Sequence, residues 1–151
     1  MRAGAGPLAP AKASDIVVGV VSSASPPCPN GIPTMFQMAL RLDADGTRRE
    51  FVIPARSVLV VTRFSYSLST VSPNQFRIAG LTVVEPVPAV DPPIVSAFDG
   101  AITDASGVAI GSSEIPHGIV VKPPAVLCAS LPNSVAESGS IVVNGFLAKS
   151  K

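Results

Sequence analysis

Residues 34–64 read TMFQMALRLDADGTRREFVIPARSVLVVTRF and hold the clearest strand pattern of the chain. From Phe36 to Leu42 apolar residues alternate with polar ones, and a period of two places the two sets on opposite faces of a strand. Asp43–Gly46 follows as a hairpin signal, because Gly accepts a positive φ and Asp bonds its own backbone. Further strands are predicted at 47–53 and at the Val-rich residues 58–64. Three adjacent strands joined by a hairpin predict a sheet nucleus.

The rest of the chain continues this pattern of short apolar runs between turn residues. Residues 65–72 extend the third strand, and a turn is predicted at 114–118. The other predicted strands are 15–22, 76–84 (with a possible bulge at Gly80), 94–101, 102–110, 119–121, 125–130 (as an edge) and 140–148. About eight strands with turn signals roughly every ten residues are typical of a sandwich or barrel. The sequence therefore predicts an all-β, antiparallel, jelly-roll-like sandwich.

The domain organisation follows from composition and proline content. A chain of 151 residues is long enough for one domain with its own core. Residues 1–14 show no periodicity and predict an extended N-terminal arm, leaving 15–151 as a single β-sandwich domain. The proline-rich residues 85–93 predict a polyproline II segment across one end or edge of the fold.

Composition also restricts the partners. Charged residues make up 14% of the chain and apolar residues 47%, so part of the surface is expected to be covered by partner subunits. Lys and Arg are scattered, with Arg48-Arg49 the one basic pair, and this excludes nucleic acid as the main partner. No apolar run is long enough to predict a membrane span, and residues 1–14 lack the apolar core of a signal peptide.

The chain has two cysteines, Cys28 and Cys128, and one histidine. These three side chains are too few to make a four-ligand zinc site from Cys and His alone. Two buried thiols are the favoured interpretation, because disulfides are rare in cytosolic proteins. The alternative is a disulfide that closes a loop of about 100 residues and contributes roughly 4–5 kcal/mol.

Three candidate sites can be weighed. His117 is the sole imidazole and the one side chain suited to base catalysis near neutral pH, but no Gly-x-Ser-x-Gly elbow accompanies it, and a surface role is favoured. Asp43 and Asp45 resemble the start of a calcium loop, yet Pro54 stands where the closing Glu belongs. Tyr66 is the one aromatic residue with a polar handle for a sugar. The sequence thus assigns no catalytic, cofactor or metal residue.

Three stretches are similar to small jelly-roll modules of bacterial and phage structural proteins. They are Phe51–Thr62, with its Val-Ile-Pro-Ala turn, then Ile115–Pro124 with Leu127-Cys128, and Ile141–Leu147 near the last strand. Pro123-Pro124 departs from the usual Pro-Gly corner. The resemblance covers about half the chain. It implies folding and assembly, as in virion decoration or surface modules, and no catalytic residues.

These observations favour a non-enzymatic structural subunit of a homo-oligomeric assembly, most concretely a phage capsid or decoration-type protein. Its expected partners are copies of itself and a larger protein scaffold. It would be made in the cytoplasm without a signal peptide and located in the virion or assembled particle. The alternative is an extracellular, cell-surface or periplasmic binding module for a glycan or peptide. That alternative predicts a Cys28–Cys128 disulfide and a monomer with an exposed aromatic cleft.

Overall fold

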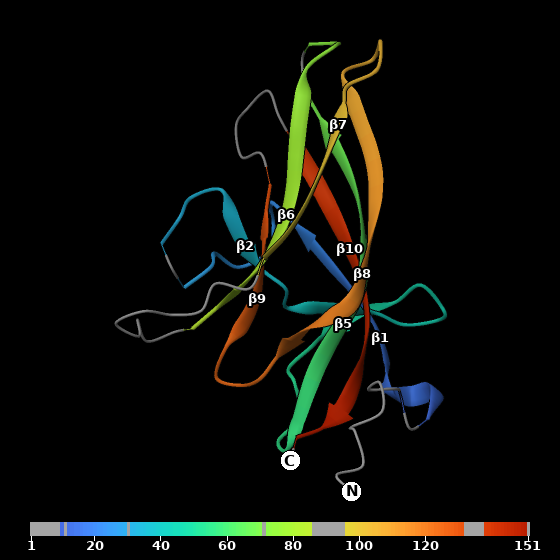
Figure 1. The fold of residues 1–151 in the computed structure, drawn as a ribbon, viewed down its shortest axis with the longest axis vertical. Coiled ribbons are helices and arrows are strands. Elements are labelled where there is room, and N and C mark those ends of the chain that lie inside the picture. Colours follow the sequence, from blue (N-terminus) through green and yellow to red (C-terminus); the bar gives the residue numbers. More distant parts are fainter. Residues whose placement is uncertain are drawn as a thin grey trace, which may run out of the picture.

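The computed structural model describes residues 10, 12–29, 31–70, 72–85, 96–131 and 138–150. Within these residues the chain is almost wholly β, with strands in two antiparallel sheets (Figure 1). A 3-10 turn, Ala13–Asp15, comes first. The strands are β1 Ile16–Ser22, β2 Met35–Gln37, β3 Leu40–Leu42, β4 Arg48–Glu50, β5 Ser57–Ser69, β6 Phe76–Val84, β7 Ser96–Ile102, β8 Val108–Val121, β9 Val126–Ser130 and β10 Ser138–Lys149. The predicted all-β, two-sheet architecture is confirmed.

The strand order differs from the predicted nucleus. One sheet has six strands in the order β4-β3-β1-β10-β5-β8, and the other has four in the order β2-β9-β6-β7. The hairpin between β3 and β4 is present as predicted, with Gly46 N–H donating to Asp43 C=O at 2.9 Å. However, β1 and β10 lie between β3 and β5, and β1 pairs with β10 along its whole length. Local turn signals could not reveal these long-range neighbours.

The alternating run from Phe36 to Leu42 is two strands in two different sheets. Strand β2 pairs with β9 in the four-stranded sheet, and β3 pairs with β1 in the six-stranded sheet. The chain crosses between them at Met38 and Ala39, where Met38 N–H still donates to Leu127 C=O and Ala39 C=O accepts from Phe51 N–H, both at 2.9 Å. A period of two predicts which side chains share a face, but it does not specify the partner strand.

The two sheets bury one main core between their inner faces. The core contains side chains from β1, β5, β8 and β10 of the larger sheet and from β6 and β9 of the smaller one. Fully buried members of large volume are Phe64, Leu59, Leu68, Leu81, Ile141, Val17, Val21, Val61, Val121 and Val143. At roughly 25 cal/mol per Å² of apolar area, this burial is the main stabilising term of the fold.

A bulge at Thr62 keeps the long strand β5 facing the core. The register with β10 skips Thr62, so Arg63 pairs with Asn144 while Val61 pairs with Gly145. The inserted residue changes which alternate positions point inward: Leu59 and Val61 before it, and Phe64, Tyr66 and Leu68 after it, all join the main core. The earlier residues Val58 and Val60 instead form a small cluster with Phe146 on the opposite face.

Several other predicted turns and edges are wrong, because residues typical of turns also occur inside strands. Residues 114–118 are not a turn but an irregular part of β8, where Gly118 has φ +69° and lies opposite the β5 bulge. Asp99-Gly100 lies within β7, and Gly80 pairs in regular register on both sides. Strand β9 is not an edge, because it lies between β2 and β6. Most of the predicted arm and of the predicted polyproline segment lies outside the described residues.

We expect Gly145→Ala to destabilise the fold by about 2–3 kcal/mol. A Cβ at Gly145 would lie 2.3 Å from Val60 O and 3.1 Å from Val60 C, and backbone atoms in a paired strand cannot move aside. Gly19→Ala is the control, because its closest neighbours are the flexible end atoms of Met38. Urea unfolding of both variants measures the difference. Equal losses of stability in the two variants would contradict the prediction.

Candidate functional site

His117 lies on the irregular segment of β8 and its side chain is exposed. Among the described residues, none forms a hydrogen bond or ion pair with its imidazole. No described residue therefore orients the imidazole of His117.

Asp43 and Asp45 organise the β3–β4 hairpin. Asp43 forms ion pairs with Arg41 (Nε–Oδ1, 3.4 Å) and Arg49 (Nε–Oδ2, 3.0 Å). Asp45 accepts hydrogen bonds from the Thr47 hydroxyl and from Thr47 N–H at 2.9 Å, and these bonds lower the pKa of Asp45. In the described part of the chain, no cluster of three His, Cys, Asp or Glu side chains could hold a metal ion. The two carboxylates therefore act in the turn.

The two cysteines form a disulfide, so the favoured interpretation of free thiols is wrong. Cys28 and Cys128 are joined with a Cα–Cα distance of 6.0 Å, and both are buried beside Met35. The bond ties the loop before β2 to β9, next to a backbone hydrogen bond from Cys28 N–H to Met35 C=O. The spacing of 100 residues gave no sign of this proximity; the pairing of β2 with β9 creates it.

Tyr66 is not an exposed sugar platform, because its side chain is 3% exposed and lies in the main core. Its hydroxyl donates a hydrogen bond of 2.7 Å to Asp99 Oδ2. Tyr66 belongs to β5 and Asp99 to the edge strand β7, so the bond joins the two sheets. Burial, followed by the hydrogen bond and the charge of Asp99, raises the pKa of Tyr66 to about 12.

We expect stability to fall as pH rises from about 10 to about 12. The pKa of Tyr66 is about 12 in the folded chain and close to 10 in an unfolded one, so the folded state holds this proton more tightly. The Tyr66 proton contributes about 2–3 kcal/mol to the free energy of unfolding below pH 10. This contribution disappears as the pH rises from the pKa of the unfolded chain to that of the folded chain. Because Tyr66 is the only tyrosine, tyrosinate absorbance reports its titration alone.

Tyr66→Phe is the variant that separates this effect from general alkaline damage. It should lose about 1.5–3 kcal/mol at neutral pH, the usual value of a hydrogen bond to a charged group. Its stability should then stay level across the pH range in which wild type weakens. An identical alkaline decline in wild type and variant would contradict the assignment.

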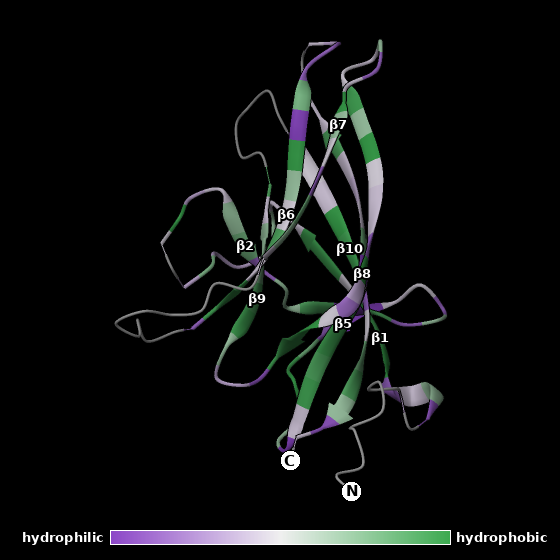
Figure 2. Cartoon of the chain, in the orientation of Figure 1, coloured by the Kyte–Doolittle hydropathy of each residue, from purple (hydrophilic) through white to green (hydrophobic). Residues whose placement is uncertain are grey.

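The outer face of the β6–β7 pair carries the most prominent exposed apolar group among the described residues. We define the β6–β7 apolar face as Phe76, Ile78, Phe98 and Ile102, which are 61%, 55%, 61% and 66% exposed. Cross-strand register places them together, with Phe76 opposite Ile102 and Ile78 opposite Gly100. Figure 2 shows the alternation of hydrophobic and hydrophilic residues along this part of β6. The four side chains expose roughly 400–500 Å², in the range of functional patches on monomers.

Two glycines make this face flat. A Cβ at Gly100 would lie 2.4 Å from Phe76 Cζ, and one at Gly80 would lie 2.5 Å from Phe98 Cδ1. Each ring therefore lies across the opposite strand, above a glycine, which is a known way to stabilise a sheet. The other side of each ring faces solvent. Sequence alone shows the alternating Phe and Ile but does not tell which face is buried.

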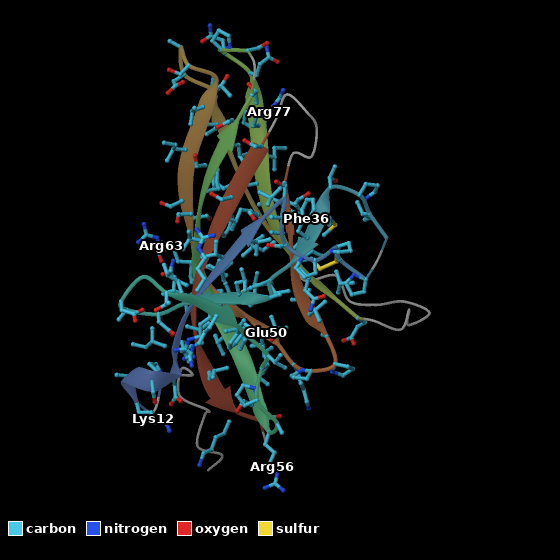
Figure 3. The ribbon with its side chains drawn as sticks, turned by 180° about the vertical axis from the view of Figure 1, so that it is seen from behind. Lys12, Phe36, Glu50, Arg56, Arg63 and Arg77 are labelled. Atoms are coloured by element: carbon cyan, nitrogen blue, oxygen red, sulfur yellow. A yellow bond between two sulfur atoms is a disulfide. The ribbon has the colours of Figure 1, made fainter. Side chains whose placement is uncertain are left out.

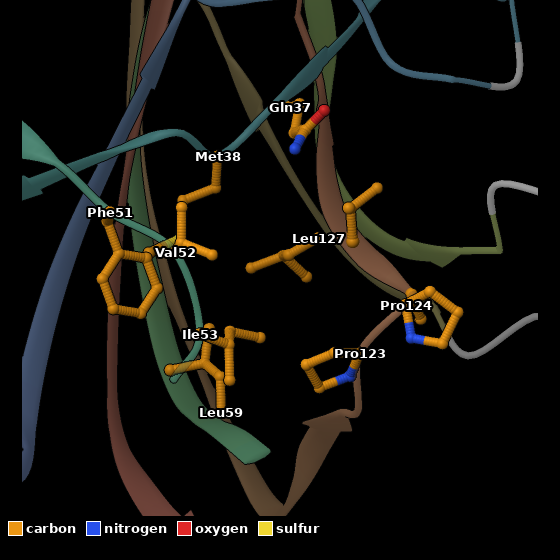
Figure 4. Close-up of a pocket in the computed structure, with 11 residues that line it drawn as sticks. Gln37, Met38, Phe51, Val52, Ile53, Leu59, Pro123, Pro124 and Leu127 are labelled. Atoms are coloured by element: carbon orange, nitrogen blue, oxygen red, sulfur yellow. The ribbon is translucent and has the colours of Figure 1, made fainter. Parts of the chain in front are cut away.

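A second feature is a pair of adjoining pockets at the opposite end of the fold. The apolar pocket has a volume of about 270 Å³ and lies between the loop after β4 and the start of β9 (Figure 4). Its wall includes Met38, Val52, Leu59 and Leu127. The second pocket, of about 300 Å³, has a mixed lining, with the apolar residues Ile53, Ala55 and Pro123 beside two serines and the cations Arg56 and Lys122; we call it the basic pocket because both of its charged residues are cationic. Ile53 and Pro123 line both pockets, so the two spaces are adjacent.

Comparisons with known proteins identify no relative. No protein-family model, curated protein or solved structure matches the chain. Within the described residues, no helix has the length and apolarity to cross a membrane.

Proposed function

We propose that this chain is a structural subunit, not an enzyme, of a homo-oligomeric assembly. The observation that carries the proposal is the β6–β7 apolar face. Arg77 and Asp99 alternate with the apolar residues of these strands and so belong to the opposite side of the strand pair, as the bond from Tyr66 to Asp99 shows. The outward positions of the face carry no charge, so a second copy brought against them meets no like-charge repulsion. Burial of such area on association is favourable at roughly 25 cal/mol per Å².

The geometry of the face suits pairing of identical surfaces. Phe76 and Phe98 stand at diagonal positions of an antiparallel strand pair, and each covers a glycine of the other strand. A two-fold interface presents the same surface from both partners, so a face that lacks charge can pair with its own copy. One partner usually buries roughly 800 Å² in a stable interface, and the β6–β7 apolar face exposes about half of that area. We therefore place this face at the centre of a larger interface.

The most concrete form of the proposal is a phage capsid or decoration-type protein of jelly-roll type, assembled with a larger protein scaffold. The low charge of the chain supports an extensively covered surface. The disulfide does not separate this proposal from the binding module, because disulfides persist on virion surfaces as well as on cell surfaces and in extracellular proteins.

The second candidate is a cell-surface, extracellular or periplasmic binding module. The adjoining pockets favour it, and the disulfide, which this class predicts, is compatible with it. Light scattering of the purified chain over a range of concentrations separates the candidates. Assembly predicts a discrete oligomer, and a monomer at every concentration would reject it.

A further inference from the structure

We propose that the adjoining pockets bind a straight-chain carboxylate, with the hydrocarbon chain in the apolar pocket and the carboxylate in the basic pocket. The proposal is independent of assembly, because the pockets share no residue with the β6–β7 apolar face. It assigns a ligand class to a part of the fold that the proposed assembly does not use.

The apolar pocket has the lining that a hydrocarbon chain requires. Apart from Gln37, the residues around it are aliphatic, aromatic, thioether or proline, and none is charged. In Figure 4 the side chains of Val52, Ile53, Leu127 and Pro123 surround the space, with Gln37 at one margin. Binding pockets usually combine such a wall with a few polar groups that fix the orientation of the ligand.

Those polar groups lie in the basic pocket. Arg56 and Lys122 are exposed there, no acidic residue lines the pocket, and neither cation forms an ion pair with a described residue. Two hydroxyl groups, of Ser57 and Ser150, line the same space and can donate to an oxygen atom. Figure 3 shows the Arg56 side chain at this end of the molecule, just before β5, directed away from the body of the fold. Both charged residues of the pocket are cationic, which favours an anion over a cation.

Two backbone turns fix the main chain that carries the two cations. Ser57 N–H donates to Pro54 C=O at 3.1 Å, and Ser150 N–H donates to Arg56 C=O at 2.8 Å, which fixes Arg56 against the end of β10. On the other side, Ala125 N–H donates to Lys122 C=O at 3.0 Å across Pro123-Pro124. The shared residue Pro123 directly follows Lys122, so an anionic group beside this cation is adjacent to the mouth of the apolar pocket. An amphiphile with one charged end matches this order of surfaces.

Calorimetric titration with hexanoate, octanoate and decanoate tests the apolar part. Each added methylene that is buried should tighten binding about fourfold until the pocket is full. Val52→Glu should weaken decanoate binding at least tenfold, because it places a carboxylate in the wall at an exposed position. Val120→Glu is the matched control, since Val120 is also exposed but lies on β8 outside both pockets, and it should bind as wild type does.

Decanol and decyltrimethylammonium test the charged part. The double variant Arg56→Gln, Lys122→Gln should weaken decanoate binding about fivefold and leave decanol binding within about twofold. The double variant Arg48→Gln, Arg49→Gln, on the exposed strand β4, is the charge-matched control. The proposal is overturned if decanoate does not bind, if chain length has no effect, if the cationic amphiphile binds as tightly as decanoate, or if Val120→Glu weakens binding as much as Val52→Glu.

Discussion

Replacing Cys28 and Cys128 together by serine is expected to lower the free energy of unfolding by about 4–5 kcal/mol. The bond closes a loop of 100 residues, so its loss restores a large amount of conformational freedom to the unfolded chain. Both sulfur atoms are buried, and the serine hydroxyls would lie in the small cluster around Met35 without assigned partners. Since domains are commonly stable by only 5–15 kcal/mol, this loss is large.

Urea unfolding of wild type, the double serine variant and the double alanine variant measures the effect. The double alanine variant removes the disulfide without adding buried hydroxyl groups. Its loss of stability therefore measures the effect of the cross-link apart from the cost of burying polar groups. Mass measurement of the native and the reduced, alkylated protein reports the bond directly. Free thiols in the native protein, or equal stability before and after reduction, would contradict the expectation.

The second large effect is expected from Ile78→Lys combined with Ile102→Lys, which should convert the assembly to monomers. Both side chains are more than half exposed, so the folded subunit should tolerate lysine at either position. Neither residue covers Gly80 or Gly100, and both phenylalanine rings keep their intramolecular positions. In a symmetric contact, each copy would bring two new charges against the same charges of its partner.

The expected weakening of association is about 4 kcal/mol or more, roughly a thousandfold in dissociation constant. Light scattering over a dilution series measures it, and circular dichroism checks that the subunits remain folded. Ile110→Lys with Val120→Lys is the matched control, because these residues are 72% and 45% exposed on β8, away from the face. An unchanged oligomer in the face variant, or equal dissociation in the control, would contradict the proposed interface.

The alternation of apolar and polar residues predicted most strands, because a sheet with one buried face has an apolar residue at every second position of each strand. The strand at 76–84 and the hairpin at Asp43–Gly46 are present where the sequence places them. The extension of the third strand, predicted over residues 65–72, is confirmed as far as Ser69, where β5 ends. In each case the determining information is local: side-chain alternation or the φ preference of a glycine.

Pairing between distant segments could not be predicted in this way. The split of residues 36–42 between two sheets, the disulfide and the contact of Tyr66 with Asp99 all depend on which strands become neighbours. The pockets are harder still, because they combine residues 37–59 with residues 122–127 and Ser150. The β6–β7 apolar face was implied only by the low charge of the chain, which indicates covered surface without saying where.

The place of β10 in the larger sheet has a consequence for synthesis on the ribosome. Strand β10 pairs with β1 on one side and β5 on the other, and both partners are translated well before it. Until residues 138–149 leave the exit tunnel, β1 and β5 expose unpaired edges that other nascent chains could join. The larger sheet is therefore complete only after β10 is made, and any chain that stops short of β10 lacks the strand that joins β1 to β5.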